Sequence, residues 1–142
     1  MTDINTIQDD IIQDFSYLDD WVEKYAYLIQ LGNELEPLDP QYKTDEHLIK
    51  GCQSQVWFNM LYEDGVIKLC ADSDALIVKG LAYLVIQVLT DQTPQDIVNA
   101  DLYFLDKVGI KQNLSPQRAN GLLAMIGAIQ RFAQQYTDSS AT

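Results

Sequence analysis

The sequence predicts an α+β fold in which helices at both ends of the chain pack with a small antiparallel sheet. Apolar residues recur every three or four positions in the first and last thirds, whereas the middle of the chain shows the two-residue alternation of strands. A block of strands set between blocks of helices is typical of α+β domains. The 142 residues suffice for one domain with its own core, and 47% hydrophobic with 21% charged residues is a globular composition.

Two helices are predicted in the first third of the chain. The first covers residues 6–18, with Thr6 or Asn5 as its cap, and its apolar stripe is formed by Ile4, Ile7, Ile11, Phe15 and Leu18. Asp19 and Asp20 introduce the second, over residues 21–35, where Gly32 and Asn33 suit the C-terminus. Two prolines within residues 36–42 predict an irregular connection to the sheet.

The sheet is predicted from residues 46–73. Asp64-Gly65 is a strong hairpin signal between two alternating runs, residues 55–63 and 66–71. Residues 46–50 are expected to add a third strand ahead of a short loop that contains Cys52. Trp57 is expected in the core, and the strand position of Cys70 predicts a structural role.

Helices resume after the sheet. Ser73 is the expected N-cap of the next one, and Thr93-Pro94 and Ser115-Pro116 are strong helix starts, because a capping hydroxyl precedes a proline at the first helical position. The last helix is expected to end near Tyr136, which leaves residues 136–142 as a frayed tail.

The charge of the chain limits its partners. The net charge is −12, so binding to nucleic acid or to an anionic membrane surface is not expected. The N-terminus lacks the pattern of a signal peptide and no apolar run is long enough to span a bilayer. With two cysteines and no C-x-x-C pair, we expect a cytoplasmic protein whose thiols are free.

Cys52 is the candidate reactive residue, because Gly51 and Ser54 place its thiol in a short polar loop beside a strand. Lys50 is close enough in sequence to lower the pKa of the thiol. A cysteine hydrolase would need His47, the one histidine, as its base. A metal site could draw on Cys52, His47, Cys70 and a carboxylate, although their spacing matches no common pattern. Accepting a sulfur atom requires a single thiolate and no other group.

Three segments together resemble the SufE/CsdE family of sulfur acceptor proteins. They are "GCQSQVW" (51–57), "ADSDALIVKGL" (71–81) and "LSPQRANGLLAM" (114–125), in the family's order and separation. The resemblance implies one domain over residues 1–142, with a fold shared with the IscU-related scaffolds. It also implies that Cys52 accepts persulfide sulfur from a cysteine desulfurase of the SufS or CsdA kind, whose PLP belongs to that partner. Asp74 and Arg118 match family positions near the cysteine loop and the desulfurase-facing surface.

The resemblance implies a carrier that stimulates the desulfurase and relays sulfur to a scaffold or other acceptor for iron–sulfur cluster assembly, with no cofactor of its own. One departure lies at residues 48–52, where Ile49 and Lys50 stand in place of the expected Val-x-Gly-Cys pattern, often with a proline before the glycine. The alternative is a module that binds the desulfurase, or assembles a cluster, without relaying sulfur.

Overall fold

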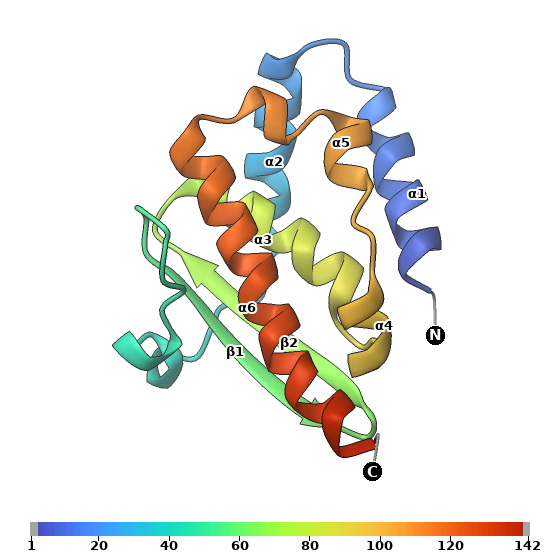
Figure 1. Ribbon diagram of the computed structural model, residues 1–142. Coiled ribbons are helices and arrows are strands. Elements are labelled where there is room, and N and C mark those ends of the chain that lie inside the picture. Colours follow the sequence, from blue (N-terminus) through green and yellow to red (C-terminus); the bar gives the residue numbers. More distant parts are fainter. Residues whose placement is uncertain (1–2, 141–142) are drawn as a thin grey trace.

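The computed structural model describes residues 3–140, and the side chains of residues 3–137. Six α-helices and one β-hairpin organise the described part of the chain (Figure 1). The elements follow in the order α1 (Ile4–Ser16), α2 (Trp21–Asn33), β1 (Val56–Glu63), β2 (Val66–Ser73), α3 (Leu76–Leu89), α4 (Pro94–Asn99), α5 (Phe104–Val108) and α6 (Pro116–Ser140). The predicted α+β class is confirmed.

The hairpin forms where Asp64-Gly65 predicts it. Asp64 (φ 55°) and Gly65 (φ 83°) both adopt the left-handed conformation that two-residue hairpin turns require. The register runs from Glu63 opposite Val66 to Val56 opposite Ser73. One face of the hairpin packs against α3 and α6, and Figure 1 shows α6 passing in front of the strands. That face carries Val56, Phe58, Ile67, Leu69 and Ala71.

The predicted third strand is wrong, because the sheet within residues 3–140 has two strands. Residues 45–47 form a 3₁₀ turn instead, and Leu48 makes an isolated bridge to Trp57. The Ile49 amide donates to the Val56 carbonyl (2.8 Å), but Gly51 then turns the chain away with φ 93°. The 3₁₀ turn and this glycine leave too few residues for a strand.

Trp57 does not lie in the core, contrary to expectation. It points to the face of β1 opposite Val56 and Phe58 and is only partly buried. The ammonium of Lys43 lies 5.8 Å from the centre of its ring. Alternation along β1 therefore determines the burial of Trp57, despite its large apolar area.

Caps explain where most helices begin. Thr93 accepts from the Asp96 amide and Ser115 from the Arg118 amide (3.3 Å), which confirms the predicted starts of α4 and α6. The cap of α1 is Asp3, not Thr6 or Asn5, since the Asp3 carboxylate accepts from the Thr6 amide (2.7 Å).

The predicted start of α3 and the predicted C-terminal end of α6 are also wrong. Ser73 does not cap α3, because it is still the last residue of β2 and the helix begins at Leu76. The C-terminal helix α6 continues to Ser140, past the predicted end at Tyr136. Residues 141 and 142 of the predicted tail lie outside the described residues.

Two contacts join the helices to the rest of the core. Gly32 of α2 meets Gly80 of α3, where a Cβ on Gly80 would overlap the Leu28 carbonyl. Gly32 thus serves close packing rather than the helix end. Buried Gln8 links α1 to the segment before α5, because it donates to the Asp101 carbonyl (3.0 Å) and accepts from the Phe104 amide (3.1 Å).

Candidate functional site

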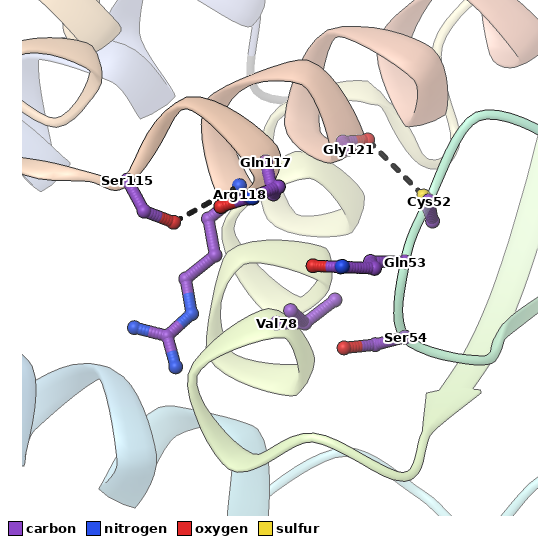
Figure 2. A pocket seen from close by; sticks show the side chains of 8 residues that line it. All are labelled: Cys52, Gln53, Ser54, Val78, Ser115, Gln117, Arg118 and Gly121. Carbon is purple, nitrogen blue, oxygen red and sulfur yellow. Dashed lines mark hydrogen bonds between the residues drawn. The ribbon is translucent and has the colours of Figure 1, made fainter.

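Cys52 lies at a cavity of about 260 Å³ formed by three segments that are distant in the sequence (Figure 2). The loop before β1, the first turn of α3 and the first two turns of α6 supply its walls. The lining residues are Cys52, Gln53, Ser54, Val78, Ser115, Gln117, Arg118 and Gly121. Of the residues predicted for the site, Cys52, Ser54 and Arg118 therefore come together around one space.

Two glycines allow the thiol to lie against α6. Gly51 takes a positive φ of 93°, which turns the chain immediately before Cys52. Gly121 has no side chain where a Cβ would stand 3.3 Å from the Cys52 sulfur. The thiol therefore reaches the helix backbone and donates a weak hydrogen bond to the Gly121 carbonyl, with Sγ and O 3.5 Å apart.

Asp74 fixes the far end of the cysteine loop. Its carboxylate accepts from the Gln55 amide (3.1 Å), and its own amide donates to the Gln55 carbonyl (3.2 Å). The Ser73 hydroxyl donates to the same carbonyl (2.8 Å). Ser73 and Asp74 thus anchor the loop on the start of α3, with residues 51–54 between this clamp and the turn at Gly51.

Arg118 lies at the edge of the cavity with its side chain exposed. Figure 2 shows its guanidinium directed away from Cys52. No ion pair within the described part of the chain includes it. A cation near the N-terminus of a helix is not favoured by the helix dipole, so its placement is not explained by the stability of α6.

The thiol is protected rather than activated. Burial raises the pKa of Cys52, and no cation among the described side chains opposes that shift. Lys50 is exposed, and the expectation that it lowers the pKa is not met. Since the thiolate is the nucleophilic form, a raised pKa lowers the share of Cys52 that is nucleophilic at any given pH.

The alternative partners predicted for Cys52 are engaged elsewhere. The Nδ1 atom of His47 lies 3.0 Å from the Thr44 hydroxyl, and its ring packs on Tyr42 with centroids 5.2 Å apart. Cys70 is exposed on β2, opposite Asn59, and does not line the cavity. In residues 3–140, no group of three or more His, Cys, Asp or Glu side chains is arranged to hold a metal ion.

The residues that sequence reasoning missed come mainly from α6. Gln117 and Gly121 line the cavity, and Gly121 accepts the hydrogen bond from the thiol. Both lie inside the segment 114–125 that resembles the family, so the resemblance carried the signal without the geometry. Val78 of α3 lies likewise within the segment 71–81.

Comparison with known proteins agrees with this architecture. The model of the SufE family, described as an Fe-S metabolism associated domain, matches residues 9–133. The fold is similar to a solution structure of a hypothetical protein from Thermus thermophilus, with a TM-score of 0.74 at 19% identity, over 91% of this chain and 94% of that one. None of the described helices is both long and apolar enough to cross a bilayer. Because the family model spans nearly the whole chain, including the cysteine loop and the start of α6, the protein belongs to the SufE family.

Proposed function

We propose that the protein accepts persulfide sulfur on Cys52 from a PLP-dependent cysteine desulfurase and relays it for iron–sulfur cluster assembly or related sulfur transfer. The observation that carries the proposal is a lone thiol, set against the Gly121 carbonyl at a small cavity, in a member of a family tied to Fe–S metabolism. The partner is a SufS- or CsdA-like enzyme, and PLP belongs to it. The downstream acceptor is a cluster scaffold or another sulfur-accepting protein.

The transfer is a thiol exchange that one thiolate can perform. The Cys52 thiolate attacks the outer sulfur of the enzyme persulfide, a new S–S bond forms at Cys52, and the S–S bond of the enzyme breaks. The electron pair of that broken bond leaves on the enzyme cysteine as a thiolate. The outer sulfur keeps its hydrogen as it moves to Cys52, and no external oxidant or reductant takes part. Removing the persulfide frees the desulfurase for its next turnover, so the desulfurase turns over faster.

The raised pKa of Cys52 makes the transfer depend on the partner. The thiol proton must leave before attack, and burial opposes this in the free protein. We infer that the desulfurase supplies the base or positive charge that the loop lacks. Arg118 then contributes an exposed cation for a carboxylate of the desulfurase, Gly51 and Asp74 hold the loop in shape, and Ser54 lines the cavity beside the thiol.

The cavity supports storage of the product. A second sulfur atom on Cys52 has space beside Val78 and Ser54, in the recess between the cysteine loop, α3 and α6. A carrier of this kind works in a reducing compartment, so the proposal places the protein in the cytoplasm.

The test is an intact mass after incubation with a desulfurase and cysteine. The wild type should gain one sulfur atom that a reductant removes, and Cys52→Ser should gain none and no longer stimulate the enzyme. Cys70→Ser is the matched control and should behave as the wild type does. A folded wild-type protein that never gains sulfur would contradict the proposal, and stimulation by Cys52→Ser would favour a regulatory module that relays no sulfur.

A further inference from the structure

A second cavity, of about 400 Å³, lies away from the cysteine loop and shares no lining residue with the first. The chain after α2 forms one wall, and β2 and α3 form the others. Its volume lies in the range of small-molecule sites. Neither the transfer of sulfur to Cys52 nor the anchoring of its loop uses this cavity.

The interior of this second cavity is largely apolar. Leu38, Leu69 and Ala71 are buried, and Leu35 and Ile86 are partly so. Pro37 also lines it, and the other uncharged lining side chains are polar or aromatic: Tyr42, Asn59, Cys70, Tyr83 and Gln87. An apolar interior with a few polar groups and two tyrosine rings suits a ligand with an apolar body.

The charged side chains that line the second cavity all have one sign. Glu34, Glu36 and Asp39 line it, and its described lining contains no lysine, arginine or histidine. Lys43 and Lys68 are neighbours of the lining in sequence, but Asp72 pairs with the first (2.8 Å) and Asp91 with the second (2.6 Å). The carboxylates of the cavity therefore have no lysine partner there.

Two of these carboxylates lie close enough to act on groups inside. Glu34 contributes, after burial, to the raised pKa of Tyr83, and Glu36 contributes in the same way to that of Cys70. Burial is the larger cause of both shifts, and the smaller contribution comes from a negative charge near side chains that line the cavity. A cation placed there would offset that charge.

We propose that this second cavity binds a small organic cation, an amine joined to an apolar body such as an aryl-alkyl group. The apolar body packs on Leu38, Leu69 and Ile86, and the ammonium lies among the carboxylates at the rim. The rings of Tyr42 and Tyr83 offer further favourable contact for a cation. Because the wall after α2 comes from an irregular segment, the ligand ties this segment to β2 and α3.

Three compounds of the same shape test the proposal: 3-phenylpropylamine, the neutral 3-phenylpropanol and the anionic 3-phenylpropionate. Each is titrated into the wild-type protein while amide shifts are followed by NMR. The amine should shift the amides of Leu35, Cys70 and Ile86 with a Kd of about 1 mM, the affinity expected for a ligand of this size. The anion should bind at least tenfold more weakly, and the amide of Gly121 should not move.

Charge and shape are then separated by variants. The double substitution Glu34→Gln with Glu36→Gln should lower the affinity for the amine about tenfold and leave the affinity for the alcohol unchanged. Glu46→Gln with Glu63→Gln removes the same charge outside the cavity and is the matched control. Cys70→Trp, at an exposed strand position, should fill the cavity and abolish binding of both the amine and the alcohol.

Several results would overturn the proposal. Equal affinity for amine and anion, or equal weakening by the two glutamate pairs, would show that the rim carboxylates do not select a cation. No shift with the amine at 10-fold its expected Kd would show that the cavity does not bind this class. Since every arm can be read without a desulfurase, failure here is distinct from failure of sulfur transfer to Cys52.

Discussion

Cys52 is a thiol whose surroundings work against its own ionisation. Burial raises its pKa, and its hydrogen bond is donated to the Gly121 carbonyl, which only the protonated form can make. In a Cys70→Ser background, where Cys52 is the one remaining thiol, alkylation by iodoacetamide should therefore be slow at pH 7. The rate should rise with a midpoint above that of the same chain in guanidinium, because a raised pKa leaves less thiolate at any pH below it.

The unfolded chain is the control for that pH profile, since it exposes the same thiol without the cavity. A folded-state midpoint at or below the unfolded one would contradict protection by burial. It would also remove the reason for requiring a base or cation from the partner.

Gly121 controls how closely the thiol can approach α6. In Gly121→Ala the new Cβ would stand 3.3 Å from the sulfur, so Cys52 must move outward, and its pKa should fall toward the ordinary value. Alkylation of the folded Cys70→Ser protein should become severalfold faster, while helix propensity adds up to about 1 kcal/mol to stability. The measurements are alkylation at fixed pH and urea unfolding.

Gly127→Ala is the matched control, because it lies on the same helix and its Cβ meets only the flexible end of Arg131. It should leave alkylation of Cys52 unchanged. Equal rates in wild type, Gly121→Ala and Gly127→Ala would show that Gly121 does not set the position of the thiol.

Individual residues mark the limit of what the sequence could predict about the site. Cys52 could be found because glycine and polar neighbours surround it locally, and Asp74 and Arg118 because they lie in family-like segments. The approach of Gly121 to a sulfur 69 positions away could not, since it depends on how α6 crosses the loop. Trp57 was misplaced because alternation along β1 outweighs side-chain hydrophobicity.

At the scale of elements, the crossing of α2 and α3 depends on Gly32 and Gly80. A Cβ on Gly80 would overlap backbone atoms of Leu28, which cannot move aside as a flexible side chain can. Gly80→Ala should therefore lower the free energy of unfolding by about 1–3 kcal/mol, in spite of the better helix propensity of alanine. Urea unfolding measures this, with Gly127→Ala as the helical control.

If Gly80→Ala had a free energy of unfolding equal to or above that of the wild type, α2 and α3 could separate at little cost. The comparison matters for the site, because α3 also carries Val78 and follows directly from the Asp74 clamp.

Elements with local signals were predicted and those that depend on packing were not. Asp64-Gly65 determines the hairpin turn, and Thr93-Pro94 and Ser115-Pro116 determine helix starts through their own caps. The third strand failed because pairing depends on how the chain leaves Gly51. The short helix α5 has no long apolar period, and it is held by buried Gln8, whose side chain accepts from the Phe104 amide.

At the scale of the whole molecule, whose net charge is −12, the cysteine cavity and the second cavity differ in the charges that line them. The cysteine cavity has an arginine at its edge and no acidic side chain in its described lining, whereas the second cavity is lined by three carboxylates and no cation. The proposed contact with a desulfurase carboxylate and the proposed amine site therefore carry opposite charge requirements.

The helices and the hairpin share one buried cluster, so we expect them to unfold together. That cluster joins Leu28 of α2 and Phe58 of β1 through α3 and α6. The chain has two tryptophans, Trp21 at the start of α2 and Trp57 in β1, so one reports on the helical part and the other on the hairpin.

Trp21→Phe leaves a reporter in the hairpin, and Trp57→Phe leaves one in the helices. Within each variant, the urea transitions followed by tryptophan fluorescence and by far-ultraviolet circular dichroism should coincide, as two-state unfolding requires. A fluorescence transition of Trp21→Phe at lower urea than its dichroism would show that the hairpin opens alone. The cysteine loop leads directly into that hairpin, and the Asp74 clamp holds it at Gln55, the residue before β1. Independent opening would thus expose Cys52 without a partner, whereas coincident transitions mean that the free protein keeps its thiol covered until it unfolds as a whole.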